Sequence, residues 1–358
     1  MEQQVSLKDK FVAALLGGAI GDALGYTVEF MSRMEILTRF GANGITTLEV
    51  DRCSGKALIS DDTQMTLFTA DGLLWADHRG KDRDRDHSRN TYPASSGLYP
   101  SYMRWHFTQQ GEVATTREEM WLEVQPHEKD FRLFDQKELF ARRAPGNTCL
   151  TALGSGTMGT VESPLNESKG CGGVMRVAPV GLFLHDDPAQ AFRVGVEAAA
   201  ITHGHPSGYL AAGAFAAIIA ELINGKELSE GVETARWLLK EYRYYEETSQ
   251  ALERAVIFAK GTERPDDAIT ELGEGWVAEE ALAIGLYCAM KRRDFRAALI
   301  MSVNHNGDSD STGAICGSFL GAYGGTGVLP KEWVEAIELR SVIETMGLRL
   351  AENVNRRK

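Results

Sequence analysis

The chain has 358 residues, of which 43% are hydrophobic and 25% are charged, a composition typical of a folded globular protein. Its 38 Lys and Arg residues face 50 Asp and Glu residues, and the net charge of −12 argues against binding to a nucleic-acid backbone. Residues 1–10 are polar and lack the apolar core of a secretion signal, and no apolar run approaches the length needed to span a bilayer. We therefore expect neither a nucleic acid nor a membrane as a partner.

Helical periodicity recurs along most of the chain, and glycine-rich loops separate the helical segments. Asp187-Pro188 is typical of a helix start, and Asn224-Gly225 is typical of a helix end. Residues 206–223 are apolar nearly all round, so they are predicted to form a central buried helix. The predicted helices are 8–24, 61–76, 187–203, 206–223, 229–242, 246–259, 276–292, 294–303 and 309–323.

Strand-like alternation is scarce and is clearest in the short segment 44–50. The mixed-charge segment 77–90 has no apolar face and is predicted to be a solvated loop. We predict an all-α fold with a polar N-terminal segment, residues 1–10, and a single domain, residues 11–358.

The first predicted helix carries Gly17, Gly18, Gly21 and Gly25, which place small residues on one face and permit another helix to approach closely. Glu29 follows this helix in apolar surroundings, where a carboxylate is costly unless it is paired or functional. Glu29 is therefore a candidate catalytic carboxylate.

Two acidic segments each open an apolar helix: residues 60–63, Ser-Asp-Asp-Thr, and residues 308–312, Asp-Ser-Asp-Ser-Thr. Helix capping explains either segment alone, but a cap needs one short side chain and each segment has several. Carboxylate and hydroxyl oxygens suit Mg²⁺, Mn²⁺ or Ca²⁺ better than Zn²⁺. Four carboxylates brought together would have to take up protons or bind cations. The pattern predicts a metal-assisted hydrolase.

Residues 168–176, Ser-Lys-Gly-Cys-Gly-Gly-Val-Met-Arg, form a glycine-rich loop before an apolar run. Its backbone N–H groups are predicted to face an anion such as a phosphate. The GxGxxG pattern at 154–159 lacks a preceding strand, which argues against a dinucleotide site. His203 and His205 lack the partners of a zinc site, and Cys171 has no obvious base that would make it a nucleophile.

Six motifs, taken in order, resemble the ADP-ribosylglycohydrolases, the group of dinitrogenase reductase-activating glycohydrolase and the ADP-ribosylarginine hydrolases. The motifs are Gly-Asp-Ala-Leu-Gly with Glu29, Ser-Asp-Asp-Thr-Gln-Met, Gly-Asn-Thr, Lys-Gly-Cys-Gly-Gly-Val-Met-Arg, Ile-Thr-His-Gly-His and Asn-His-Asn-Gly-Asp-Ser-Asp-Ser-Thr-Gly. The resemblance extends from Phe11 to about Ile343. It implies a compact all-α orthogonal bundle with a cleft that holds two divalent cations, Mg²⁺ or Mn²⁺.

Carried over position by position, the resemblance implies three sets of site residues. Implied metal ligands are Ser60, Asp61, Asp62, Asp308, Asp310 and Ser311, and the family commonly has Thr in place of Ser60 and Ser311. Implied catalytic residues are Glu29, Asp61, Asp62 and Asp310. Implied ADP-ribose contacts are Asn147, Lys169, Gly170, Cys171, Gly172, Gly173, His203 and Trp276, although Trp276 is equally compatible with a core position. Tyr102, Arg104 and Trp105 resemble a structural element of the family.

The resemblance implies an enzyme that removes ADP-ribose from modified protein side chains, above all arginine, and so reverses mono-ADP-ribosylation. Hydrolysis of another linkage, to serine, a nucleic-acid base or a small molecule, is an alternative. A further alternative is a bacterial immunity protein that neutralises an ADP-ribosyltransferase toxin by binding or hydrolysis. The five cysteines are odd in number and have no CxxC spacing, as expected for a cytoplasmic protein: Cys53, Cys149, Cys171, Cys288 and Cys316.

Overall fold

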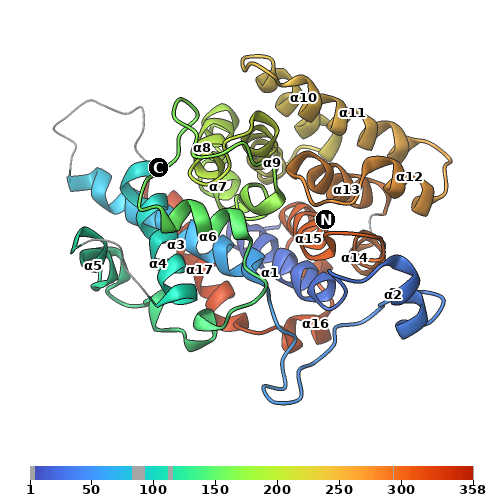
Figure 1. Cartoon of the computed structure of the whole chain (residues 1–358), viewed down its shortest axis with the longest axis horizontal. Helices are drawn as coiled ribbons and strands as arrows, with labels where there is room; N and C mark the ends of the chain where they lie inside the picture. The colour runs from blue at the N-terminus through green and yellow to red at the C-terminus, as the bar shows by residue number, and fades with distance from the viewer. Residues whose placement is uncertain (1–4, 83–92, 112–115, 293, 358) are drawn as a thin grey trace.

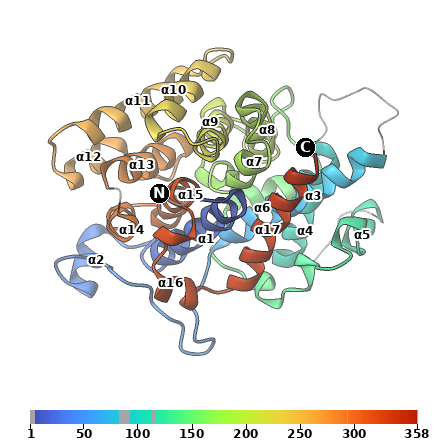
Figure 2. The same ribbon diagram turned by 180° about the vertical axis from the view of Figure 1, so that it is seen from behind.

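The computed structural model describes residues 5–82, 93–111, 116–292 and 294–357. Within these ranges the protein is a bundle of α-helices, and its only β-structure is two isolated bridges (Figures 1 and 2). The helices are α1 (Leu7–Tyr26), α2 (Arg33–Phe40), α3 (Asp61–Asp82), α4 (Tyr99–Gln110), α5 (Thr116–Leu122), α6 (Asn147–Gly154), α7 (Ala178–Phe183), α8 (Pro188–Ala200), α9 (Pro206–Ile223), α10 (Leu228–Leu239), α11 (Glu246–Lys260), α12 (Pro265–Leu272), α13 (Ala278–Lys291), α14 (Phe295–Val303), α15 (Ser309–Gly324), α16 (Lys331–Ala336) and α17 (Arg340–Arg357). The all-α prediction is confirmed.

Every predicted helical segment is helical in the structure, and residues 206–223 match α9 at both ends. The predictions missed short helices such as α2 and α6, and also the long helix α17. Helix α1 begins at Leu7, after Ser6, whose side chain accepts a hydrogen bond from the backbone of Asp9. The last residues of the polar segment 1–10 therefore belong to the first helix.

Two predictions for the segments outside the helices are wrong. Residues 44–50 form an irregular loop rather than a strand, because the Asn304 amide binds the backbone of Ile45 at both N–H (2.8 Å) and C=O (2.9 Å). Residues 77–82 are not a loop but the last turns of α3, where the Arg79 guanidinium lies 4.6 Å above the ring of Trp75. Residues 83–90 lie outside the described residues.

Helices α1 and α15 pack backbone against backbone, as the glycines of the first helix predicted. A methyl group built on Gly21 would lie 2.0 Å from the Gly313 carbonyl oxygen, and one built on Gly17 would lie 2.4 Å from that of Gly317. Residue numbers rise along α1 while those of its contacts fall along α15, so the two helices are antiparallel. The N-terminus of α15 therefore lies beside the C-terminal end of α1.

Helix α9 lies in the upper middle of the bundle in Figure 1, packed against α7, α8, α10 and α13. By length and composition it could cross a membrane, contrary to the prediction that no apolar run is long enough. However, 94% of it is buried inside the fold, as in the core helix of a globular domain. Among the described residues, no other helix meets that criterion.

Candidate active site

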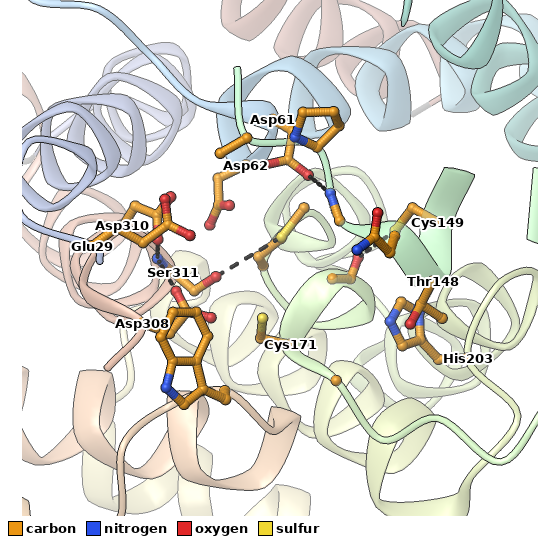
Figure 3. A pocket seen from close by; sticks show the side chains of 18 of the residues that line it. Glu29, Asp61, Asp62, Thr148, Cys149, Cys171, His203, Asp308, Asp310 and Ser311 are labelled. Carbon is orange, nitrogen blue, oxygen red and sulfur yellow. Dashed lines mark hydrogen bonds between the residues drawn. The ribbon is translucent and has the colours of Figure 1, made fainter. Parts of the chain in front are cut away.

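A cavity of about 510 Å³ lies where the C-terminal end of α1 meets the N-termini of α3 and α15 (Figure 3). Its wall includes side chains from both acidic segments, although about 250 residues separate them in sequence. Five carboxylates line it: Glu29, Asp61, Asp62, Asp308 and Asp310. The fold therefore brings together the groups that the sequence suggested would meet.

Asp22, on a fully buried turn of α1, holds the start of α3. Its carboxylate accepts hydrogen bonds from the backbone N–H groups of Ser60 (3.0 Å) and Thr63 (3.1 Å), and from the hydroxyl of Thr63. Burial raises the pKa of Asp22 to about 7, and the nearby charge of Asp310 adds to the effect. Asp22 thus accepts the N–H groups at the N-terminus of α3 that lack a partner within the helix. The aspartates of α3 are not needed as caps and can face the cavity.

Asp61 is held from its other side by the loop that precedes α6. The Asp61 backbone N–H donates to the Arg143 carbonyl (3.1 Å), and the Gly146 N–H donates to the Asp61 carboxylate (3.1 Å). Between these contacts Ala144 has φ +49°, a left-handed conformation that is costly for a residue with a Cβ. The chain bears this strain where it wraps around an aspartate of the cavity.

Asp308 caps α15, because its carboxylate accepts the backbone N–H of Ser311 at 3.1 Å. Asp310 accepts the same N–H at 3.0 Å. The capping interpretation therefore holds for Asp308 but not for the aspartates of α3, whose cap is Asp22. Figure 3 shows Asp308, Asp310 and Glu29 on one side of the cavity and Asp61 and Asp62 above it.

Not every carboxylate oxygen of the cavity has a partner within the protein. One oxygen of Asp62 and one of Glu29 are buried without a hydrogen-bond partner. Burial raises the pKa of Asp61, Asp62 and Asp308 well above the usual range, and repulsion among the carboxylates adds to it; the pKa of Glu29 rises to about 10 for the same two reasons. Unpaired buried carboxylates are costly, and a hard divalent cation is the partner that oxygen donors fit best. The residues present therefore fit a metal centre.

The opposite wall of the cavity is the glycine-rich loop with His203 behind it, as Figure 3 shows. This loop is bridged to the segment before α13: the Cys171 N–H donates to the Trp276 carbonyl (3.2 Å), and the Ala278 N–H donates to the Lys169 carbonyl (2.8 Å). The bridge fixes Trp276 at the rim, where 41% of its surface is exposed. Its ring stacks on Phe30 at 6.1 Å between centroids, so it is not a core residue.

A sequence model of the family described as ADP-ribosylglycohydrolase matches residues 3–358. The chain belongs to this family. Over 340 residues it is 26% identical to ADP-ribosyl-[dinitrogen reductase] glycohydrolase of Rhodospirillum rubrum, covering 94% of this chain and 92% of the relative. Over 354 residues it is 24% identical to ADP-ribosylarginine hydrolase Tri1 of Pseudomonas putida, covering 96% and 78% respectively.

The fold of the family is also found in a solved structure described as an ADP-ribosylglycohydrolase-related protein complex. It matches with a TM-score of 0.61 at 23% identity, over 97% of this chain and 99% of that one. Membership confirms the resemblance inferred from the motifs and makes the protein an ADP-ribosylglycohydrolase, an enzyme that hydrolyses glycosidic bonds.

Most of the residues that the family motifs implied line the cavity of this glycohydrolase, but three do not. Ser60 is fully buried behind Asp62, whose backbone N–H donates to the Ser60 hydroxyl at 3.2 Å. Gly173 is buried against α8, where a methyl group would lie 2.9 Å from the Cβ of Ala199. The Lys169 ammonium forms ion pairs with Glu279 (2.6 Å) and Glu247 (2.7 Å) instead of lining the cavity. Their functional roles stay predictions.

A second group of metal-ligating residue types lies away from the cavity: Asp71, His127 and Glu128. Here Arg104 already supplies the positive charge, with two hydrogen bonds to Glu128 at 2.7 and 2.9 Å. His127 bonds Asp71 at 2.7 Å. Because its carboxylates are paired, this cluster is structural, as the family resemblance implied for Arg104.

Sequence reasoning missed Asp22, Thr148 and Phe30 as parts of the site. The sequence did contain a signal for Asp22, because an aspartate on the buried face of an apolar helix is rare unless its carboxylate has a partner. Thr148 belongs to the Gly-Asn-Thr motif but was given no role, and Phe30 had no signal beyond its position next to Glu29. Thr148 lies on the cavity wall and its hydroxyl contacts that of Ser168 at 3.1 Å.

Proposed function

We propose that this enzyme removes ADP-ribose from arginine side chains of modified proteins and works with two divalent cations, Mg²⁺ or Mn²⁺. The observation that carries the proposal is one cavity with five carboxylates at one end and a glycine-rich wall with a histidine at the other. The names of the two relatives, which refer to dinitrogen reductase and to arginine, support a protein substrate with this linkage.

The carboxylate end would hold the cations through Asp61, Asp62, Asp308, Asp310 and Ser311, with Ser60 supporting Asp62. The donor set supports this role, because it combines carboxylates and hydroxyls and includes a buried Asp62 oxygen without a protein partner. Bound there, the cations would polarise the ribose hydroxyls and the attacking water.

The reaction forms a bond from a water oxygen to the anomeric carbon of the ribose and breaks the bond from that carbon to the side-chain nitrogen. The nitrogen keeps the electron pair and takes a proton, and a carboxylate of the cavity takes the proton that the water loses. Glu29 is the proposed proton donor, because its side chain lies on the cavity wall and one of its oxygens has no hydrogen-bond partner in the protein. The aspartates stabilise the positive charge that develops on the ribose.

An arginine acceptor suits the charge of this end of the cavity. A guanidinium group is cationic and planar, and carboxylates are its natural partners. The rim aromatics Phe30 and Trp276 offer flat faces on which a guanidinium can stack. A serine acceptor would gain from neither feature.

The proposal is tested by incubating the enzyme with arginine-, serine- and DNA-linked ADP-ribose in Mg²⁺, in Mn²⁺ and in a chelator, and by measuring released ADP-ribose. We expect release from arginine in either metal and none in the chelator. Faster release from serine or DNA would overturn the arginine assignment, and full activity in the chelator would overturn the metal centre. Release from no substrate, with tight binding of an ADP-ribosyltransferase, would favour the immunity alternative.

A further inference from the structure

We propose that Arg176 and Thr202 are positioning residues that fix His203 as a neutral imidazole whose Nε2–H donates into the cavity. The acceptor would be an anionic oxygen of the ligand, such as a phosphate oxygen of ADP-ribose. The identity of the ligand rests on the proposed function, whereas the state of the imidazole does not. The proposal follows from the contacts of one hydroxyl group, that of Thr202, with three neighbours.

Arg176 is a fully buried cation behind the cavity wall, with its guanidinium 4.2 Å from the ring of Tyr102. Its Nη2 donates to the Ala198 carbonyl (2.9 Å) and contacts the Thr202 hydroxyl oxygen (2.8 Å). A guanidinium can only donate hydrogen bonds. The Thr202 oxygen is therefore the acceptor in this contact, and its own hydrogen must be used elsewhere.

The Thr202 hydroxyl hydrogen can reach Nδ1 of His203 at 2.8 Å, the Ala199 carbonyl at 3.4 Å and the sulfur of Cys149, which is only a weak acceptor. The Ala199 carbonyl already accepts the backbone N–H groups of Thr202 (3.0 Å) and His203 (2.9 Å), so both of its lone pairs are used. A distance of 3.4 Å is also long for a hydroxyl donor, whereas 2.8 Å is ideal. The hydroxyl therefore donates to His203 Nδ1.

An imidazole whose Nδ1 accepts a hydrogen bond carries its proton on Nε2 when it is neutral. His203 is neutral, because burial lowers its pKa to about 3 and the charge of Arg176 adds to the effect. The Nε2 edge faces the glycine-rich loop: a methyl group built on Gly170 or Gly172 would lie 3.5 or 3.3 Å from Nε2. Glycine at both positions keeps this edge accessible from the cavity.

This arrangement suits an anionic ligand in a strongly acidic cavity. The Thr202 hydroxyl lies between the guanidinium of Arg176 and the imidazole of His203. The positive charge of Arg176 therefore polarises this hydroxyl and, through it, the imidazole. The neutral imidazole of His203 then offers an N–H donor to the ligand. Because it is not an imidazolium, it does not transfer a proton to the carboxylates on the opposite side of the cavity. We expect the donor to be present throughout the physiological pH range, since burial holds the pKa of His203 far below that range.

The first test is nitrogen NMR of the full-length enzyme labelled with ¹⁵N-histidine, with the His203 signals assigned by their loss in His203→Gln. We expect a protonated Nε2 and an unprotonated Nδ1 between pH 6 and pH 8. A protonated Nδ1, or two protonated nitrogens, would overturn the proposal. The measurement needs neither metal nor substrate, so it stands even if the wild-type enzyme proves not to bind ADP-ribose.

The second test compares Thr202→Val, which removes the hydroxyl, with Thr202→Ser, which keeps it. In Thr202→Val we expect a mixture of imidazole tautomers and an affinity for ADP-ribose about tenfold weaker by calorimetry. Thr202→Ser should keep the wild-type tautomer and affinity. An unchanged tautomer in Thr202→Val overturns the role of Thr202, and circular dichroism of both variants excludes a folding defect as the cause of any loss.

Discussion

Two buried clusters of carboxylates in this molecule solve the same electrostatic problem in opposite ways. In the first, Asp71 and Glu128 share the guanidinium of Arg104, and His127 completes the set. In the second, the carboxylates of the cavity have no cation of their own among the described side chains within ion-pair distance. The pKa of Asp71 falls to about 2, whereas the pKa of Asp62 rises. The charges of the first cluster are balanced within the protein, whereas the second cluster fits a cation that binds from outside. We call the first the complete cluster and the second the cavity cluster.

The largest expected effect comes from removing one charge of the cavity cluster. Asp62→Asn should lower kcat/KM for arginine-linked ADP-ribose about 1000-fold or more, because a predicted cation ligand is lost. The same change should raise the melting temperature in a chelator, because it removes a buried unpaired charge. Activity assays and thermal unfolding give both results, and a fall in the melting temperature would contradict the comparison.

The matching change in the complete cluster should act on stability instead. Arg104→Met leaves Asp71 and Glu128 buried without their cation, which should cost about 3–5 kcal/mol in the free energy of unfolding. Urea denaturation measures it, and Arg104→Met with Glu128→Gln should recover part of the loss. If the single variant is as stable as the wild type, the cluster does not depend on Arg104.

Adding the missing partner should stabilise only the cavity cluster. Mg²⁺ or Mn²⁺ at a hundred times its dissociation constant should add about 2.7 kcal/mol to the free energy of unfolding. Asp62→Asn should lose most of this gain, whereas His127→Gln should retain it, since His127 belongs to the complete cluster. If the stabilisation by metal is lost in His127→Gln and kept in Asp62→Asn, the cation binds at the cluster of Asp71, His127 and Glu128, and the prediction is wrong.

The complete cluster should also show in the pH dependence of stability. Burial opposes ionisation of Asp71, but the charges and hydrogen bonds of His127 and Arg104 outweigh it and lower the pKa from 3.8 to about 2. Stabilisation by this group is therefore fully present above about pH 4 and is lost as the pH falls through 2. The loss should be about 2 kcal/mol. Acid titration of Asp71→Asn should lack this component; an identical acid profile would refute the assignment.

The smallest expected effect concerns Lys169. Like Arg104 in the complete cluster, Lys169 is paired with two carboxylates of the protein, those of Glu279 and Glu247. Lys169→Met should weaken ADP-ribose binding by about fivefold, because it releases the glycine-rich loop from Glu279 and Glu247. Glu279→Gln should weaken binding to a similar extent, which calorimetry can compare. A loss confined to Lys169→Met would instead indicate direct contact with the ligand.

Local patterns were enough to predict nine of the seventeen α-helices of the described residues and the two acidic segments, because periodicity and hydroxyl-flanked aspartates are properties of short windows. The glycines of α1 even indicated that another helix would approach it. The missing parts are contacts between distant segments: Asp22 with the start of α3, Gly146 with Asp61, and Thr202 with Arg176. A short segment of sequence carries no information about which distant residues it will contact. For the same reason the pairing of Asn304 with residues 44–50 was not predicted.

The backbone contact of α1 with α15 also sets a condition on how the enzyme comes into being. Gly17 meets Gly317 and Gly21 meets Gly313, so the two helices that frame the carboxylate cluster are separated by about 300 residues of chain. Joining segments so far apart costs loop-closure entropy and slows folding. During synthesis the first helix must wait until nearly the whole chain has left the ribosome. The proposed cation site therefore cannot form in a partly made enzyme, and we expect any metal to bind among the last events of its maturation.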